Sequence, residues 1–222
     1  IARQKVLFEG HPVAAVAART LEIAEQAISL IKVEYEELKA VQDPVEAMAP
    51  DAPLLDEKLH TDSMGGKSEK PSNVALHVEL GRGDVEKAFA ESDVIVEREF
   101  KTAIVHQGYI EPEAETAWVR PDGHVQVWAD TQGIFDHRSQ LAQVLAMPEG
   151  DITVEGTEVG GAFGGKAQTR LSPICIVLSR KSGRPVRLVL TRTEVLQATG
   201  PGAHGVFTVK AGATKDGKIK GL

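Results

Sequence analysis

Four glycines gather in the six positions 160–165, directly after a predicted strand. Glycine has no Cβ, so such a segment exposes backbone N–H groups and lets a ligand approach the main chain closely. The chemistry expected there is the binding of an anion or another oxygen-rich group. The Gly-x-Gly-x-x-Gly spacing of dinucleotide sites is absent, and Lys166 is followed by Ala167, which excludes a P-loop. Taken alone, the same glycines also fit a bend in a sheet.

A second polar segment contains His106, Tyr109 and Glu111, which can all hold or move protons. Glu111 precedes a proline, which favours extended backbone. A metal centre would need a third ligand that the sequence does not indicate, so no residue is predicted to bind a metal. A buried polar network is the expected role of this segment.

Gln132 follows Asp130 and Thr131, either of which can cap the helix predicted after them. The side-chain amide of Gln132 both donates and accepts hydrogen bonds, which suits contact with an oxo or carbonyl group. Helix capping alone is the other interpretation of this segment.

Hydrophobic periodicity predicts the elements that position these residues. Strands over 13–18 and 31–35 flank a helix capped by Thr20, which would form a β-α-β unit. The later elements mix hairpins with helices, which predicts the α+β class. They comprise a helix after Asp84, a strand over 94–100, a hairpin of 116–119 with 124–128, a helix over 135–145, a strand over 152–159, a helix capped by Ser172 and ended by Gly183, a strand over 186–190 and a helix with a capping box of Thr191 and Glu194.

Composition limits the classes of protein. Hydrophobic residues form 42% of the 222, enough for a core, and the net charge of −7 argues against nucleic-acid binding. No apolar run approaches the ~20 residues of a membrane span. The single cysteine excludes an internal disulfide and is compatible with a reducing compartment, so we expect a cytoplasmic protein. The chain begins with Ile1 and stops soon after a turn signal at 216–217, so we expect a piece of a longer polypeptide.

In this order, these motifs resemble the molybdopterin-binding subunit of the xanthine dehydrogenase and aldehyde oxidase family. The matching segments are 6–16, 83–85, 106–112, 131–132, 161–166, 184–186 and 190–194. The resemblance implies the end of a small α/β hammerhead-like domain over 1–60, a polar linker over 61–74, and the first part of a larger mixed α/β cofactor-binding domain over 75–222.

The resemblance also implies a molybdenum–pterin cofactor, as molybdopterin or its cytosine dinucleotide form. Its pterin sulfurs would bind the metal, Gln132 would donate a hydrogen bond to an oxo ligand, and the backbone amides of Phe163 and Gly164 would lie near the oxygen ligands of the metal. The cofactor-binding residues it implies are Gln132, Gly161, Ala162, Phe163, Gly164 and Gly165. The family's catalytic base, a Glu, would lie beyond this chain.

Two departures from the family pattern concern the same loop. Ala162 replaces a frequent glycine, and Ala167 stands where purine-oxidising members carry an acidic residue, so a purine substrate is not expected.

The activity implied is that of a molybdenum hydroxylase acting on an aldehyde or aromatic heterocycle, in an oligomer with iron–sulfur clusters and FAD on partner domains or subunits. A reductive enzyme of aromatic thioesters, of the hydroxybenzoyl-CoA reductase kind, a carbon monoxide dehydrogenase-like enzyme, and a non-catalytic anion-binding or interaction domain are the alternatives.

Overall fold

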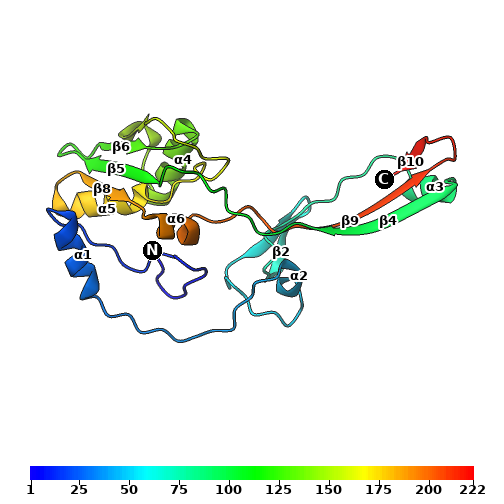
Figure 1. Ribbon diagram of the computed structural model, residues 1–222, viewed down its shortest axis with the longest axis horizontal. Coiled ribbons are helices and arrows are strands. Elements are labelled where there is room, and N and C mark those ends of the chain that lie inside the picture. Colours follow the sequence, from blue (N-terminus) through cyan, green and yellow to red (C-terminus); the bar gives the residue numbers. More distant parts are fainter. The chain divides into compact units, whose positions relative to one another are not determined.

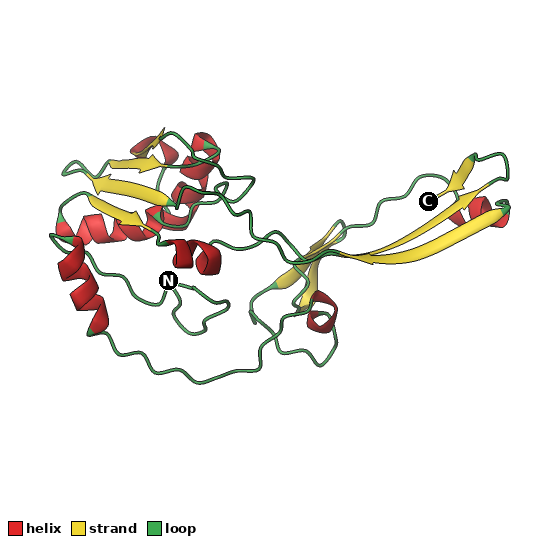
Figure 2. Ribbon diagram, in the orientation of Figure 1, coloured by secondary structure: helices red, strands yellow, loops and turns green.

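A computed structural model describes residues 1–222, which form two compact units (Figure 1). The first unit consists of 1–35 and 105–202, and the second of 36–104 and 203–222. Each unit has its own sheets and helices (Figure 2), so each is described by itself. No helix is both long and apolar enough to cross a membrane.

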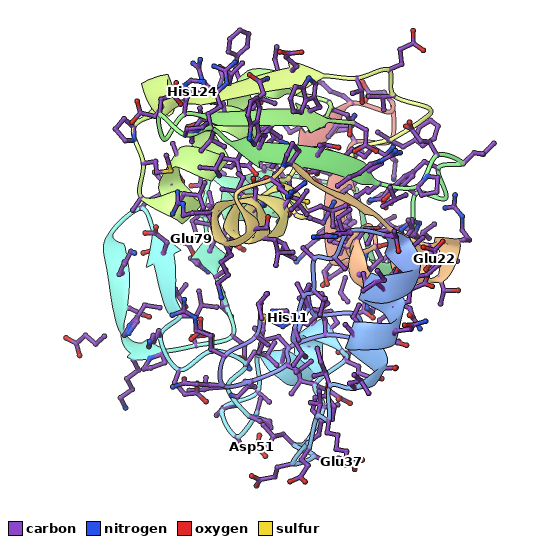
Figure 3. The ribbon with its side chains drawn as sticks, turned by 90° about the vertical axis from the view of Figure 1, so that its left-hand side faces the viewer. His11, Glu22, Glu37, Asp51, Glu79 and His124 are labelled. Atoms are coloured by element: carbon purple, nitrogen blue, oxygen red, sulfur yellow. The ribbon has the colours of Figure 1, made fainter.

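A four-stranded sheet organises the first unit, in the order β7-β6-β5-β8. Its strands are β5 (Ala114–Val119), β6 (Val125–Ala129), β7 (Ile152–Gly156) and β8 (Val186–Val189). Strand β5 is antiparallel to β6 and β8, which confirms the predicted hairpin, whereas β6 and β7 are parallel. His124, labelled in Figure 3, lies where this hairpin enters β6, and its Nε2 is 2.9 Å from Thr153 Oγ1 on β7.

Two helices cover this sheet and contact each other, α4 (Ile134–Leu145) and α5 (Ser172–Ser182). α4 connects the parallel strands β6 and β7, as a β-α-β crossover requires, with the short 3₁₀ helix η1 (Glu149–Asp151) before β7. The core between helices and sheet consists of Ala117, Val125, Val127, Ala129, Leu141, Ala142, Ile152, Cys175 and Ile176.

Helix ends in the first unit follow local signals in three cases. Thr20 caps α1 (Leu21–Ser29), the capping box of Thr191 and Glu194 begins α6 (Arg192–Ala198), and Gly183 ends α5 with a φ of 66°. These three predictions are confirmed.

Two other caps were predicted wrongly. Gly133 is the N-cap of α4 without a side-chain bond, and Leu171 precedes α5, so Ser172 is its first helical residue. The carboxylate of Asp130 pairs with Lys166, and the Ser172 hydroxyl binds Glu115. Because these side chains bind residues distant in the sequence, neither caps the helix that was predicted for it.

The predicted strands over 13–18 and 31–35 are also wrong, because neither segment joins a sheet. The apolar run of 13–18 and the alternation of 31–35 are typical of strands, but a strand also needs a neighbour to accept its backbone hydrogen bonds. Of the predicted β-α-β unit, the structure contains the helix α1.

The second unit has two three-stranded sheets. The first has the order β2-β1-β3 and consists of β1 (His60–Ser63), β2 (Gly66–Pro71) and β3 (Leu76–His77). The second has the order β10-β9-β4 and consists of β4 (Val94–Lys101), β9 (Val206–Ala213) and β10 (Ile219–Gly221). The helices are α2 (Pro44–Ala47) and α3 (Val85–Ala90). Mixed helices and small sheets in both units confirm the predicted α+β class.

The segment 61–74, predicted as a polar linker, contains most of the antiparallel pair β1 and β2. Polar contacts support this pair, among them His60 Nδ1 at 2.8 Å from Ser68 O. Hydrophobic periodicity gives no signal for strands built this way. The domain limits at residues 60 and 75 stay a prediction.

Candidate functional site

The glycine-rich segment 160–165 ends in a tight turn. Gly165 N donates to Ala162 O at 2.8 Å, and the two central residues, Phe163 and Gly164, have φ values of 52° and 88°. Positive φ at both positions is the signature of a type I′ turn. Phe163 is strained there because its Cβ disfavours positive φ, and the residue is 76% exposed. The turn therefore presents this residue and its backbone outward.

Four successive backbone N–H groups in this loop, those of Gly161, Ala162, Phe163 and Gly164, have no acceptor within the chain. Consecutive free amides form a concave site for negative or oxygen-rich groups. A Cβ built on Gly164 would meet nothing within 4 Å, so the space beside these donors is open. The loop thus has the donors and the room that the sequence predicted.

The other glycines of the loop pack against the segment that contains Tyr109 and Glu111. A Cβ on Gly165 would lie 2.6 Å from Tyr109 Cε1, and a Cβ on Gly160 would lie 2.8 Å from Glu111 Cβ. A side chain cannot enter at such distances without displacing Tyr109 or Glu111. These two glycines allow close packing, whereas Gly164 borders open space.

A buried lysine joins the loop to two carboxylates. Lys166 Nζ lies 2.7 Å from Glu111 Oε2 and 2.7 Å from Asp130 Oδ2, and its side chain is 1% exposed. Burial opposes the ammonium charge, but the hydrogen bonds and charges of Asp130 and Glu111 outweigh it and raise the pKa of Lys166. For Glu111, burial is likewise outweighed by Lys166 and by the backbone N–H of Gly160, so the pKa of Glu111 falls. Burial, the largest effect, raises the pKa of Asp130, although its contacts with Lys166 oppose that rise.

Gln132 lies against the end of the loop. Its Oε1 accepts from Lys166 N at 3.2 Å, and its backbone N donates to Lys166 O at 3.1 Å. Thr131 Oγ1 donates to the same carbonyl at 3.3 Å. The Gln132 side chain is exposed and its amide nitrogen has no partner within the chain. The fold therefore bonds Gln132, which has a free amide donor, to Lys166, the residue that directly follows the loop.

The polar network predicted for His106 and Tyr109 is present. His106 Nε2 lies 2.8 Å from Thr199 Oγ1, and Tyr109 OH lies 3.1 Å from the same hydroxyl and 3.0 Å from Glu113 Oε1. Arg170 Nη1 donates to Glu113 Oε1 at 3.0 Å and also to Gly165 O. The network therefore supports the loop from behind. Glu111 contacts Lys166 instead of this network.

Sequence reasoning missed two further acidic residues. Glu111, Glu113 and Glu115 alternate along one extended stretch, and they contact Lys166, Arg170 and Ser172 respectively. Alternate residues of a strand point to the same face, so the spacing was a usable signal. The contacts attach the segment after the glycine loop to the beginning of β5.

At the far end of this row, Glu115 lies in the core beside His137. Glu115 Oε2 accepts from the Ser172 hydroxyl and lies 3.8 Å from His137 Nε2. Burial raises the pKa of Glu115 to about 7, and burial lowers the pKa of His137 to about 4. His137 Nδ1 is buried without a partner. The pair is therefore sensitive to pH.

The first unit combines a mixed sheet and two covering helices with a loop of free backbone donors. The molybdopterin cofactor-binding domain family matches residues 67–222, and the α/β hammerhead domain of aldehyde oxidase and xanthine dehydrogenase matches residues 1–39. The chain belongs to the molybdopterin-binding family of xanthine dehydrogenases and aldehyde oxidases. The resemblance seen in the sequence motifs is thereby confirmed.

Known proteins similar to the chain include a probable xanthine dehydrogenase subunit of Bacillus subtilis, 34% identical over 99% of this chain and 28% of the relative. The nicotinate dehydrogenase large molybdopterin subunit of Eubacterium barkeri is 29% identical over 98% of this chain and 48% of the relative. Among solved structures, a CO dehydrogenase from Oligotropha carboxidovorans matches with a TM-score of 0.76 at 29% identity, over 91% of this chain and 26% of that one. The chain thus spans about a quarter to a half of the length of these proteins.

Proposed function

We propose that this chain is part of a molybdenum-cofactor-dependent oxidoreductase, in which the glycine loop and Gln132 bind the molybdenum–pterin cofactor. One observation carries the proposal, namely that the loop has four unpaired backbone N–H groups and that Gln132, with an unpaired side-chain amide, is bonded to Lys166 directly after the loop. All are hydrogen-bond donors, and such a set stabilises oxygen atoms that carry negative charge.

The donor set fits this cofactor. Oxo and phosphate oxygens accept hydrogen bonds from amides, and the open side of Gly164 leaves room for a bulky group. No cluster of His, Cys, Asp and Glu suited to a metal ion occurs in the chain, and none is needed, because the pterin brings its own sulfur ligands. When bound, the cofactor supplies two-electron oxidation and reduction of a carbon centre. Gly161, Ala162, Phe163, Gly164 and Gln132 would orient it, and Gly165 would let the loop pack on Tyr109.

The reaction proposed is hydroxylation of an aldehyde or aromatic heterocycle as the small-molecule substrate. Ala167 is exposed next to the site and offers only a methyl group, which supports a substrate without a purine-type anchor. The relatives are named for xanthine, nicotinate and carbon monoxide, so the family includes several substrates. We further propose an oligomeric cytoplasmic enzyme with iron–sulfur and flavin partners, and domains over 1–60 and 75–222.

The test measures molybdenum and pterin per folded molecule of the full-length protein. Gly164→Val is compared with Gly123→Val, a matched control in the β5–β6 hairpin of the same unit. Both glycines have a φ of 88° and open space around a built Cβ, so both substitutions impose the same backbone strain. We expect similar losses of melting temperature from the two variants, but loss of molybdenum and pterin from Gly164→Val only.

Two outcomes would contradict the proposal. A full-length protein that contains neither molybdenum nor pterin would refute the proposed oxidoreductase function and favour a non-catalytic anion-binding domain. Full cofactor content in a destabilised Gly164→Val variant would show that the loop is only a bend.

A further inference from the structure

We propose that Lys166 is a positioning residue, whose buried ammonium group, bound by Glu111 and Asp130, fixes the glycine loop against Gln132. The inference rests on the proposed function, because it concerns how the cofactor-binding donors are aligned. It assigns a role to Lys166, Glu111 and Asp130, none of which is among the donors of the proposed cofactor site.

The first observation is that one carboxylate connects both ends of the loop. Glu111 Oε2 accepts from Gly160 N at 2.6 Å, at the start of the loop, and from Lys166 Nζ at 2.7 Å, directly after its end. The four free N–H groups lie between these two contacts. Their directions therefore depend on how firmly Glu111 and Lys166 fix the two ends.

The second observation is that Lys166 connects this loop to the segment of Gln132 in several ways. Its Nζ binds Asp130 at 2.7 Å, its N donates to Gln132 Oε1 at 3.2 Å, and its O accepts from Gln132 N at 3.1 Å. Asp130 is itself anchored, since its Oδ2 accepts from Ala114 N at 3.3 Å on β5. The glycine loop and the segment of Gln132 are thus both fixed, through Lys166 and Asp130, to strand β5.

The alternative is that Lys166 only neutralises buried carboxylates. Asp130 is 3% exposed, so removal of the ammonium leaves it without its cation and destabilises the fold whatever happens to the loop. A stability measurement alone cannot separate the two roles. A variant that removes lysine and carboxylate charge together can separate them, because it restores charge balance without restoring the contact.

The experiment uses the full-length protein in three forms: wild type, Lys166→Met, and the double variant Lys166→Met with Asp130→Asn. Asparagine keeps an oxygen that can accept from Ala114 N. Three quantities are measured, namely melting temperature, amide hydrogen exchange at residues 160 and 166, and molybdenum and pterin retained after dialysis. Ser179→Ala is the control, because this buried hydroxyl bonds Val119 N and Arg184 O, away from the loop.

For Lys166→Met we expect a lower melting temperature, exchange at least about tenfold faster at both amides, and cofactor loss, since a buried charge and the loop anchor are removed together. The double variant should recover much of the melting temperature, while its exchange stays fast and its cofactor is still lost. Ser179→Ala should lose stability with unchanged exchange at residues 160 and 166 and full cofactor content.

If the double variant recovers wild-type exchange and cofactor retention together with its stability, the positioning role is refuted.

If Lys166→Met does not fold, the Glu111→Ala variant tests the positioning role instead. The Glu111 side chain is 34% exposed, and its removal leaves the Lys166–Asp130 pair intact. Faster exchange at residue 160 with weaker cofactor retention supports the inference, and no change in either refutes it. A wild type without molybdenum and pterin would refute the proposed function, whereas the exchange rates would still decide whether Lys166 fixes the loop.

Discussion

The buried pair Glu115 and His137 makes the stability of the first unit depend on pH in two opposing ways. Glu115 is 5% exposed and His137 is 1% exposed. The pKa of Glu115 rises from 4.5 to about 7, chiefly because burial disfavours its charged form. The pKa of His137 falls from 6.5 to about 4 for the same reason. Neither shift depends mainly on the other residue, so each survives removal of its neighbour.

The signs follow from proton linkage. Between pH 4.5 and about 7, unfolding lets Glu115 release its proton, so its contribution to stability falls as the pH rises. Between about pH 4 and 6.5, unfolding lets His137 gain a proton, so its contribution rises with pH. The ranges overlap from pH 4.5 to 6.5, where the two slopes cancel in the wild type. Each slope alone approaches about 1.4 kcal/mol per pH unit.

Substitution of one partner should reveal the slope of the other. For Glu115→Gln we expect the free energy of unfolding to rise with pH, relative to wild type, by up to ~3 kcal/mol between pH 4.5 and 6.5. For His137→Gln we expect a fall of similar size over the same range. The measurement is urea unfolding of the full-length protein at several pH values, with each variant compared with wild type so that other titrating groups cancel.

Ser179→Ala is the control, because it removes a buried hydroxyl without removing a titrating group. It should lower stability and keep the pH dependence of the wild type. Parallel pH profiles for wild type, Glu115→Gln and His137→Gln would refute the reasoning, because they would mean that neither residue changes its pKa on folding. A slope of the same sign in both variants would also refute it.

Two further predictions concern the loop. Gln132→Glu keeps an oxygen that can accept from Lys166 N but loses the amide donor. We therefore expect a nearly unchanged melting temperature and turnover about tenfold to a hundredfold lower. Unchanged turnover at normal cofactor content would exclude Gln132 from the site. Gly165→Ala places a Cβ 2.6 Å from Tyr109 Cε1, so we expect a loss of ~1–3 kcal/mol in the free energy of unfolding. The double variant of Gly165→Ala with Tyr109→Leu should recover part of this loss. No loss in the single variant would show that the packing is looser than the structure indicates.

Local signals in the sequence determined several elements correctly. The capping box of Thr191 and Glu194, the hairpin of 116–119 with 124–128 and the helix stop at Gly183 each depend on residues close together in the chain. The density of glycines at 160–165 likewise identified the loop, because Gly161 and Gly164 adopt the positive φ that glycine permits.

What the tertiary structure decided was the partner of each polar side chain. Asp130 and Ser172 have the residue types of helix caps, yet Asp130 binds Lys166 and Ser172 binds Glu115. A cap competes with any stronger partner that folding brings near, and an ammonium group 36 residues along the chain is such a partner for Asp130.

The strands show the same division. Residues 13–18 form an apolar run typical of a buried strand but have no neighbour in a sheet. The polar residues of β1 and β2 pair with each other without a hydrophobic pattern. The sequence by itself determined local geometry, because turns, caps and glycine conformations depend on adjacent residues. Pairing of strands and of charges depends on segments far apart in the chain, so only the tertiary structure decided which carboxylates support the loop and which segments became sheet.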